Sequence, residues 1–313
     1  MAKIDVSVII PVYNAEKYVE RCAESVVGAL KNFNGKSEIL ITDNDSQDDS
    51  LKIIQKLAKK YPKLIRVLQC HTPGAGAVRN YAVREAKGEY FWFIDADDEV
   101  TPDSVNKLMH EARKSGADFV MLGLSKVFPD GHTDLVPAFS PQKPDFASRF
   151  IRSELGPVQV FVRREWYLKH DFRFLEGIIH EDMDMMPALM LYTDKISYID
   201  EPLYIYYQNP DSVLHKLEWT EHYFDIFPAL ESLYRRFDEV GAVKKYHAEL
   251  EWFFIWNLLM DSAEYYTKFP EGREGLKRSR EMLKKYFPHW RKNKFLKNCN
   301  LRTRLKIILN YYK

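Results

Sequence analysis

Three aspartates stand where they could hold a metal ion: Asp95, Asp97 and Asp98 come directly after the apolar residues 89–94. Carboxylates this close repel one another and raise each other's proton affinity. A divalent cation offsets that cost, and Mg²⁺ or Mn²⁺ commonly bridges one or two carboxylates to substrate phosphates. The pattern indicates a metal and diphosphate site, while a solvated acidic turn that caps the next helix fits the same residues.

Other polar residues follow other apolar segments. Tyr13 comes after residues 6–10 and is either a core residue or a stacking surface for a base. The turn that begins at Asp43 follows residues 38–42 and is open to the same two interpretations, a ligand site or a helix cap. Arg79 and Asn80 open a helix, where backbone N–H groups and a cation can face an anion, although a surface arginine is equally compatible.

Short apolar runs that alternate with helical periodicity must position these residues. Strands are predicted at 6–10, 38–42, 64–69, 89–94 and 118–124. Pro11 is expected to end the first strand, and Asn14 is expected to cap a helix that runs to about Leu30. This order predicts an α/β fold with a Rossmann-like, mostly parallel sheet flanked by helices. Ligands bind such sheets beyond the carboxyl ends of the strands, where the polar clusters fall.

The later half of the chain is less regular. Residues 125–156 are expected to be irregular, because they contain several prolines. A strand is predicted at 158–163, an apolar helix at 183–192 and strand material at 196–207. Helices rich in aromatic residues are expected from about residue 221 onward.

Four segments in order carry a family resemblance: VSVIIPVYNAEKYVERCAESV, EILITDNDSQDDS, PGAGAVRNYAVREAKGEYFWFIDADDEVTPDSV and HEDMDM. Together they resemble family 2 of inverting glycosyltransferases, which have the GT-A fold. The resemblance covers residues 4 to 215. It implies a catalytic domain at 1–215, with a nucleotide-binding half at about 1–124 and an acceptor half at about 125–215. Residues 216–313 then form a helical C-terminal region.

The resemblance also implies roles for the nucleotide-binding residues. Pro11 and Tyr13 stand where the family lines the base, with the aromatic ring stacked on it. Asp43 stands where a carboxylate accepts a hydrogen bond from the base, typically uracil. Arg79 and Asn80 stand near the base and the diphosphate.

Roles for the acidic residues follow in the same way. Asp95 is expected to lie towards the ribose, Asp97 is the expected metal ligand, and Asp98 is a second candidate for the metal. Glu181 and Asp182 match the family's later ED motif, with Glu181 on the donor side and Asp182 as the base. The implied cofactors are Mn²⁺ or Mg²⁺ and a nucleotide-sugar donor, which is expected to be UDP-linked.

The chain departs from the family at the second strand. The common turn reads DDGS, and here it reads Asp43-Asn44-Asp45-Ser46. Asn44 removes a charge, and Asp45 replaces a glycine. Aspartate tolerates the left-handed backbone conformation better than most residues, so the turn can survive. His180 has no family role and is either a core histidine or an acceptor contact.

The expected reaction moves a sugar to a hydroxyl of a glycan or lipid-linked glycan acceptor, in surface polysaccharide biosynthesis. A hydroxyl is a weak nucleophile, so a positioned base is needed, and one displacement inverts the anomeric carbon. Two alternatives remain. A nucleotidyltransferase usually carries a glycine-rich basic loop after its first strand, where this chain has Pro11 to Asn14. A catalytically weak nucleotide-sugar-binding protein would not need both Asp97 and Asp182.

Composition bounds the environment and the partners. The net charge is +1, which gives no argument for nucleic-acid binding. Single cysteines at 22, 70 and 299, without a signal peptide or an apolar run long enough to span a bilayer, predict a cytoplasmic protein. Residues 290–313 are basic, without Asp or Glu, and interleaved with large apolar residues. Such a segment is typical of a peripheral contact with the inner face of the plasma membrane, or of a helix packed on the protein.

Overall fold

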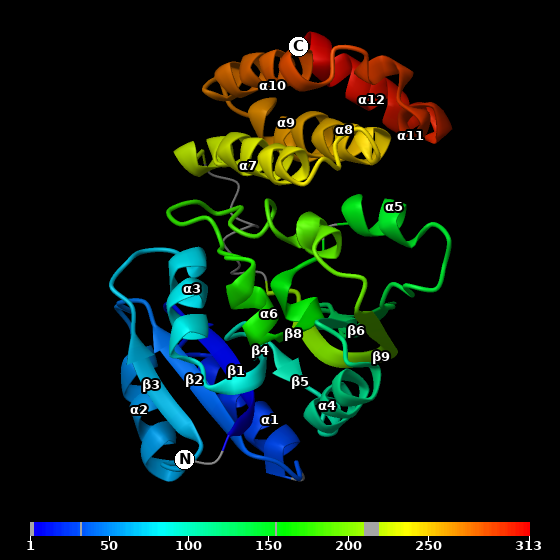
Figure 1. The fold of residues 1–313 in the computed structure, drawn as a ribbon. Helices are drawn as coiled ribbons and strands as arrows, with labels where there is room; N and C mark the ends of the chain where they lie inside the picture. Colours follow the sequence, from blue (N-terminus) through cyan, green and yellow to red (C-terminus); the bar gives the residue numbers. More distant parts are fainter. Residues whose placement is uncertain (1–2, 32, 154, 210–218) are drawn as a thin grey trace. The chain divides into compact units, whose positions relative to one another are not determined.

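The computed structural model describes residues 3–31, 33–153, 155–209 and 219–313. The chain folds into two compact units, drawn in Figure 1. The first comprises Met1–Phe146, Leu155–Gly177 and Tyr192–Leu214, and the second comprises Ala147–Glu154, Ile178–Leu191 and His215–Lys313. The expected boundary between residues 215 and 216 lies outside the described residues.

The first unit is built on one mixed sheet with the strand order β3-β2-β1-β4-β8-β6-β9-β5, and β7 pairs with β6. Its strands are β1 (Ile4–Val12), β2 (Ser37–Asp43), β3 (Ile65–Gln69), β4 (Gly88–Phe93), β5 (Glu99–Val100), β6 (Phe119–Val127), β7 (Thr133–Val136), β8 (Val160–Arg163) and β9 (Ile196–Tyr207). The four strands β3, β2, β1 and β4 are parallel, as predicted. β8 then enters antiparallel between β4 and β6, and β6 pairs parallel with β9, so the sheet is mixed.

Helices cover both faces of this sheet. They are α1 (Val19–Lys31), α2 (Ser50–Lys60), α3 (Ala75–Glu85), α4 (Ser104–Ser115) and α6 (Arg164–Lys169). The side chains of α1, α2 and α4 form one core cluster with alternate residues of the central strands, such as Val6, Val8 and Trp92. On the other face the rings of Phe91 and Phe93 are oriented edge-on to other rings, Phe91 to Tyr167 of α6. Burial on both faces explains why these strands read as continuous apolar runs.

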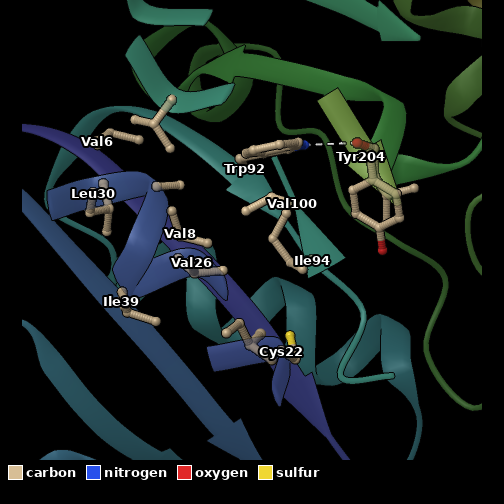
Figure 2. Packing of buried hydrophobic residues seen from close by; sticks show 14 of the residues in the cluster. Val6, Val8, Cys22, Val26, Leu30, Ile39, Trp92, Ile94, Val100 and Tyr204 are labelled. Atoms are coloured by element: carbon tan, nitrogen blue, oxygen red, sulfur yellow. Dashed lines mark hydrogen bonds between the residues drawn. The ribbon is translucent and has the colours of Figure 1, made fainter. Parts of the chain in front are cut away.

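Figure 2 shows part of this core from close by, with Trp92, Ile94 and Tyr204 among the residues labelled. Trp92 lies near the end of β4, Ile94 follows that strand directly, and Tyr204 comes from β9. All three side chains are fully buried. The Trp92 indole N–H donates to the carbonyl oxygen of Val158 at 2.7 Å. The segment that carries the aspartates is therefore anchored in a close-packed core.

Two expectations for the first strand and helix were wrong. β1 continues past Pro11 to Val12. At Pro11 the strand pairs with β2 alone, because its pairing with β4 ends at Ile9. A proline, which has no N–H, is tolerated where a strand has a single neighbour. α1 begins at Val19, so Asn14 is not its N-cap. Asn14 has a φ of 49°, and its side-chain oxygen accepts from the N–H of Gln47 at 2.8 Å. It therefore joins the loop after β1 to the loop after β2.

Two later expectations also change. Residues 125–156 are not wholly irregular, because β6 and β7 form a hairpin and α5 (Phe146–Ile151) follows. The helix predicted at 183–192 is a turn followed by a 3₁₀ helix, Met186–Leu191. Pro187 lies at the second position of that helix, where it lacks the N–H that a continuous α-helix from Met183 would require.

The second unit is helical. It contains α7 (Ile226–Glu239), α8 (His247–Trp256), α9 (Ser262–Tyr266), α10 (Gly272–Tyr286), α11 (Lys294–Asn298) and α12 (Leu301–Tyr312). Its core includes Phe237, Phe254, Phe287 and Trp290, all of which are at most 1% exposed. Leu296 and Ile307 of the basic tail are equally buried. Part of the tail therefore belongs to the core of this unit, and residues 290–313 do not form a separate surface segment.

Among the described residues, none of the helices combines the length and the apolar character needed to cross a bilayer.

Candidate active site

The acidic turn after β4, residues 95–98, is held from two sides by arginines. Arg79 of α3 donates from Nη2 to Oδ1 of Asp95 at 2.8 Å, and the Arg79 side chain is only 7% exposed. Arg21 of α1 donates to the backbone oxygen of Asp97 at 2.6 Å and pairs with Glu99 at 2.9 Å. Its guanidinium lies over the ring of Tyr207, 4.1 Å from the centroid. Arg79 therefore pairs with the Asp95 carboxylate, and Arg21 holds the backbone of the turn at Asp97.

Asp98 is the most deeply buried of the three aspartates, at 1% exposure. Its Oδ2 accepts from the hydroxyl of Tyr204 at 2.5 Å, and its Oδ1 accepts from the backbone N–H of Tyr207 at 2.8 Å. Burial and the nearby Asp95 charge raise the pKa of Asp98 to about 8. Both oxygens are thus engaged by β9, which sequence reasoning did not predict. The role that this geometry defines for Asp98 is to fasten the turn to β9.

Asp97 is the half-buried carboxylate of the turn. Burial and the charge of Asp95 raise its pKa above the ordinary value. A raised pKa means that the ionised form carries an electrostatic cost, which a bound cation would remove. Among the described residues, no group of three or more His, Cys, Asp or Glu side chains is arranged to hold a metal by itself. The donor set of Asp97 and Asp95 instead fits a cation completed by substrate phosphates and water, which is how Mg²⁺ is often bound.

The ends of β1 and β2 supply the residues predicted to hold a base. Tyr13 follows β1 and its ring is 62% exposed, so it is not a core residue. Asp43 ends β2 at 1% exposure, and its Oδ2 accepts from the N–H of Ser46 at 3.3 Å. Its Oδ1 has no hydrogen-bond partner among the described residues. A buried polar atom without a partner lowers the stability of the fold by about 1–3 kcal/mol. A donor on a bound ligand can supply the missing hydrogen bond to this oxygen.

Asn44 explains the departure from the family's common turn. Its amide nitrogen donates to the carbonyl oxygens of Cys70 and Thr72 at 2.7 and 2.9 Å, and its Oδ1 accepts from the N–H of Gly74 at 2.9 Å. A carboxylate at this position could make only the last of these bonds. Asp45 has a φ of 55°, so aspartate does adopt the left-handed conformation expected of it.

The side chain of Asn80 binds other protein groups and is not simply an anion contact. Its side chain is buried and exchanges two hydrogen bonds with the backbone of Phe174, at 2.9 Å each. It also donates to Glu176 at 2.9 Å. Phe174 in turn lies near the Arg79 guanidinium, 5.5 Å from ring centroid to carbon. Asn80 therefore holds the segment that packs on Arg79.

Glu181 and Asp182 belong to the second unit and are half-buried. The backbone oxygen of Asp182 accepts from the N–H groups of Met185 and Met186 at 3.1 and 2.9 Å, which makes the ED motif the first turn before the 3₁₀ helix. Burial lowers the pKa of the neighbouring His180, so that imidazole is neutral at pH 7.

A buried ion pair fixes the same turn to α7. Asp184 is fully buried, and its Oδ2 accepts from Nε of Arg236 at 2.8 Å and from the hydroxyl of Ser232 at 2.9 Å. The N–H of Ile179 donates to Asp225 at 3.1 Å, at the start of α7. Asp184 was missed in the sequence, although it stands within the EDMDM segment. Its place two residues after Asp182 makes it a positioning residue for that turn.

The fold of the first unit, with its acidic turn at the carboxyl end of a parallel strand, is that of the GT-A glycosyltransferases. The model of the family described as glycosyl transferase family 2 matches residues 7–168, and the chain belongs to that family. It is therefore a glycosyltransferase.

Two relatives whose names describe glycosyltransferases align with most of this chain. "Uncharacterized glycosyltransferase YibD" of Escherichia coli (strain K12) is 29% identical over 263 residues, which are 78% of this chain and 75% of the relative. "Uncharacterized glycosyltransferase EpsJ" of Bacillus subtilis (strain 168) is 28% identical over 253 residues, 77% of this chain and 72% of the relative.

Solved structures show the same fold. Staphylococcus aureus TarS 1-349 in complex with UDP-GlcNAc has a TM-score of 0.59 at 18% identity, with 98% of this chain and 79% of that chain covered. The mannosyltransferase PcManGT from Pyrobaculum calidifontis, in complex with GDP-Man and Mn²⁺, has a TM-score of 0.52 at 15% identity, with 100% and 88% covered. At these identities the likeness establishes the fold alone.

Proposed function

We propose that this glycosyltransferase moves a sugar from a UDP-linked donor to a hydroxyl of a glycan or lipid-linked glycan, with inversion and with help from a divalent metal. The observation that carries the proposal is the acidic turn after β4, where Arg79 and Arg21 hold Asp95 and Asp97 at the carboxyl end of a parallel strand. This edge is where open α/β sheets bind nucleotides.

Mn²⁺ or Mg²⁺ would be held by Asp97, with Asp95 beside it. When bound, it supplies a Lewis acid that neutralises charge on the departing diphosphate. Asp98 keeps the turn in place through Tyr204 and Tyr207 and is assigned no direct metal bond. Arg79, already paired with Asp95 at 2.8 Å, adds a fixed positive charge on the same side.

The donor's base is assigned to the ends of β1 and β2. Pro11 directs the chain to Tyr13, whose exposed ring can stack on a base, and the unsatisfied Oδ1 of Asp43 can accept from an N–H such as that of uracil. Structures of similar fold were solved with UDP, with UDP-GlcNAc and with GDP-Man and Mn²⁺, which supports a nucleotide-sugar donor.

Asp182 is assigned the general base, with Glu181 on the donor side. Asp182 takes the proton of the acceptor hydroxyl. The oxygen of that hydroxyl attacks the anomeric carbon, and the bond from this carbon to the nucleoside diphosphate breaks on the opposite face. A single displacement of this kind inverts the configuration. The buried pair of Asp184 and Arg236 gives the turn that carries Asp182 a fixed attachment to α7.

The acceptor is proposed to be a growing surface polysaccharide. Partial relatives include "Chondroitin synthase" of Escherichia coli, 38% identical over 109 residues. Another is "Poly(ribitol-phosphate) beta-N-acetylglucosaminyltransferase TarS" of Staphylococcus aureus, 26% identical over 203 residues. The second name describes transfer to poly(ribitol-phosphate) and the first names a synthase, and together they support a polymeric acceptor here.

Donor turnover tests the proposal. The protein is incubated with a panel of UDP- and GDP-sugars, with Mn²⁺ or with a chelator, and the released nucleotide is measured. The proposal expects slow metal-dependent release of UDP from one donor, because water can replace a missing acceptor. A donor that binds and raises the melting temperature without turnover would indicate a binding protein instead. Release of pyrophosphate from UTP and a sugar phosphate would indicate a nucleotidyltransferase.

A further inference from the structure

The last helix, α12, has one face that belongs to the core of the second unit. Ile307 is fully buried and Tyr311 is 7% exposed. Asn310 is also buried, and its amide nitrogen donates to the carbonyl oxygen of Leu259 at 2.9 Å. These contacts fix which side of the helix turns inward, so the exposure of the other side is a property of the folded protein.

The outward face carries large apolar side chains: Leu301, Leu305, Leu309 and Tyr312 are 70%, 48%, 59% and 70% exposed. Their spacing of four, four and three residues places them in one stripe along the helix. Elsewhere in the described part of the chain, the exposed large apolar side chains are scattered singly, as at Leu135 and Val240. Single exposed residues need no explanation, but a continuous stripe marks an interaction surface.

Basic residues flank the stripe. Arg302, Arg304, Lys306 and Lys313 are all exposed. Lys306 approaches Glu264 at 3.9 Å, which is a weak surface pair. Residues 301–313 contain no Asp or Glu, so the helix itself carries a net positive charge, which Glu264 offsets in part near Lys306.

The charge decides between two occupants of this face. A second copy of the chain would bring an identical basic surface against it, and like charges across an interface are repulsive. An anionic lipid surface satisfies both features, because the apolar side chains enter the headgroup region and the flanking cations pair with lipid phosphates. Each Lys or Arg close to such a surface contributes favourably to binding.

We propose that the exposed face of α12, formed by Leu301, Leu305, Leu309 and Tyr312 with their basic neighbours, binds the surface of an anionic lipid bilayer. The helix lies in the plane of the interface and does not span it. This inference concerns the second unit and is independent of the proposed transfer reaction, so either can fail without the other.

Vesicle co-sedimentation of the full chain tests the proposal. Vesicles of phosphatidylglycerol and phosphatidylcholine are compared with pure phosphatidylcholine, at low and at high salt. We expect binding to the anionic vesicles, with the bound fraction falling as salt screens the charges. The double variant L305E/L309E should bind at least tenfold more weakly. Both positions are exposed, so its thermal melt should match the wild type.

Matched variants separate a surface effect from a general one. L135E changes a leucine in β7 of the first unit that is 70% exposed, more than Leu305 or Leu309, and should bind vesicles like the wild type. K56E/K59E lowers the net charge by the same amount as R302E/R304E but on α2, so only R302E/R304E should weaken binding.

Three outcomes would overturn the proposal. The wild type could fail to sediment with anionic vesicles at low salt. The L305E/L309E variant could fold and sediment as the wild type does, which would place the membrane contact elsewhere. The wild type could instead be a dimer in solution that L305E/L309E converts to a monomer, without vesicle binding by either, which would make this face an interface between copies.

Discussion

Arg79 and Asp95 form an ion pair between α3 and the turn after β4, with Nη2 and Oδ1 2.8 Å apart; the Arg79 side chain is 7% exposed and the Asp95 side chain 36%. The guanidinium also lies near the rings of Phe93 and Phe174, at 5.8 and 5.5 Å from their centroids. A planar guanidinium suits such an aromatic setting and still presents several N–H donors. The pair therefore fixes where the positive charge stands relative to the acidic turn.

Replacement of Arg79 by lysine should weaken donor binding. Lysine keeps the charge but has one compact ammonium group, which cannot lie between two rings and bond Asp95 with the same geometry. A charge-assisted hydrogen bond contributes about 1.5–3 kcal/mol, so we expect the donor's Kd to rise about tenfold to a hundredfold. Isothermal titration with the donor and Mn²⁺ measures this. Arg84→Lys, an exposed change on the same helix, should leave Kd unchanged.

Asn44→Asp restores the residue common in the family and should nevertheless destabilise this protein. The carboxylate would face the carbonyl oxygens of Cys70 and Thr72, which now accept hydrogen bonds from the amide. Loss of the bond to Cys70 leaves a buried acceptor unsatisfied, which costs about 1–3 kcal/mol, and loss of the part-buried bond to Thr72 adds to that cost. Urea unfolding should show a lower midpoint. The exposed change Asn34→Asp serves as the control, and an unchanged midpoint in Asn44→Asp would refute the role given to Asn44.

Asp97→Asn should abolish metal-dependent turnover and leave the fold intact. The amide retains the shape of the side chain but removes the charge that would hold the cation. Because burial raises the pKa of Asp97, removal of this carboxylate should not lower the melting temperature. Initial rates across a Mn²⁺ series measure the effect, and Asp200→Asn provides an exposed control. Near-normal rates at saturating Mn²⁺ would reject the assignment.

Asp182→Asn separates chemistry from binding. General-base catalysis typically contributes about 10²–10⁴-fold, so the transfer rate should fall by that factor while the donor's Kd stays unchanged. Asp194→Asn is exposed and should behave as the wild type. If Asp182→Asn loses donor affinity together with turnover, Asp182 is a binding or structural residue.

Glu249 gives the second unit a dependence on pH. Burial alone would raise the pKa of Glu249. Hydrogen bonds from Lys294 and Ser148, at 2.8 and 3.0 Å, outweigh this effect, so the pKa lies below its ordinary value of 4.5. A lowered pKa in the folded state contributes stability above the unfolded pKa, and that stability is lost as the pH falls through the folded pKa. Glu249→Gln should therefore lower the free energy of unfolding by about 1–2 kcal/mol at pH 7.

The difference between Glu249→Gln and the wild type should be smaller at an acidic pH below the folded pKa of Glu249 than at pH 7, because the wild-type side chain is then protonated and neutral as well. Urea unfolding at the two pH values provides the comparison. Glu281→Gln, an exposed change in α10, should show no difference at either pH. An equal loss at both pH values would mean that packing, and not the charge of Glu249, stabilises this part of the helical unit.

The parallel strands were predictable because each is buried on both faces and reads as a continuous apolar run. Their carboxyl ends therefore located Tyr13, Asp43 and the acidic turn correctly. The antiparallel entry of β8 was not predictable, since a strand of four residues does not specify which distant strands it will pair with. In the second unit, Pro187 was a local signal against the long helix predicted at 183–192, but the apolar pattern of the segment concealed that signal.

The hydrogen-bond partners of Asp98 in the acidic turn could not be predicted either, because a short segment does not specify which distant residues it will contact. Tyr204 and Tyr207 lie more than a hundred residues after Asp98, and alternating aromatic residues at 196–207 indicate a strand without indicating its contacts. Arg79 was found because it follows a glycine-containing loop, although α3 begins at Ala75 and Arg79 lies in its second turn, not at its start. The bonds of Asn80 to Phe174 depend on tertiary structure alone.

The attachment of Asp98 to β9 bears on the order in which the enzyme can become functional during synthesis. The family match ends at residue 168, yet the strand that receives Asp98 begins at Ile196. A nascent chain that has exposed only the matched segment has its parallel strands available but not the residues that fasten the acidic turn. Contacts of such long sequence separation form late, because the intervening loop must first be closed. Donor binding should therefore appear on the ribosome only after β9 has emerged, well after the characteristic motif of the family has been made.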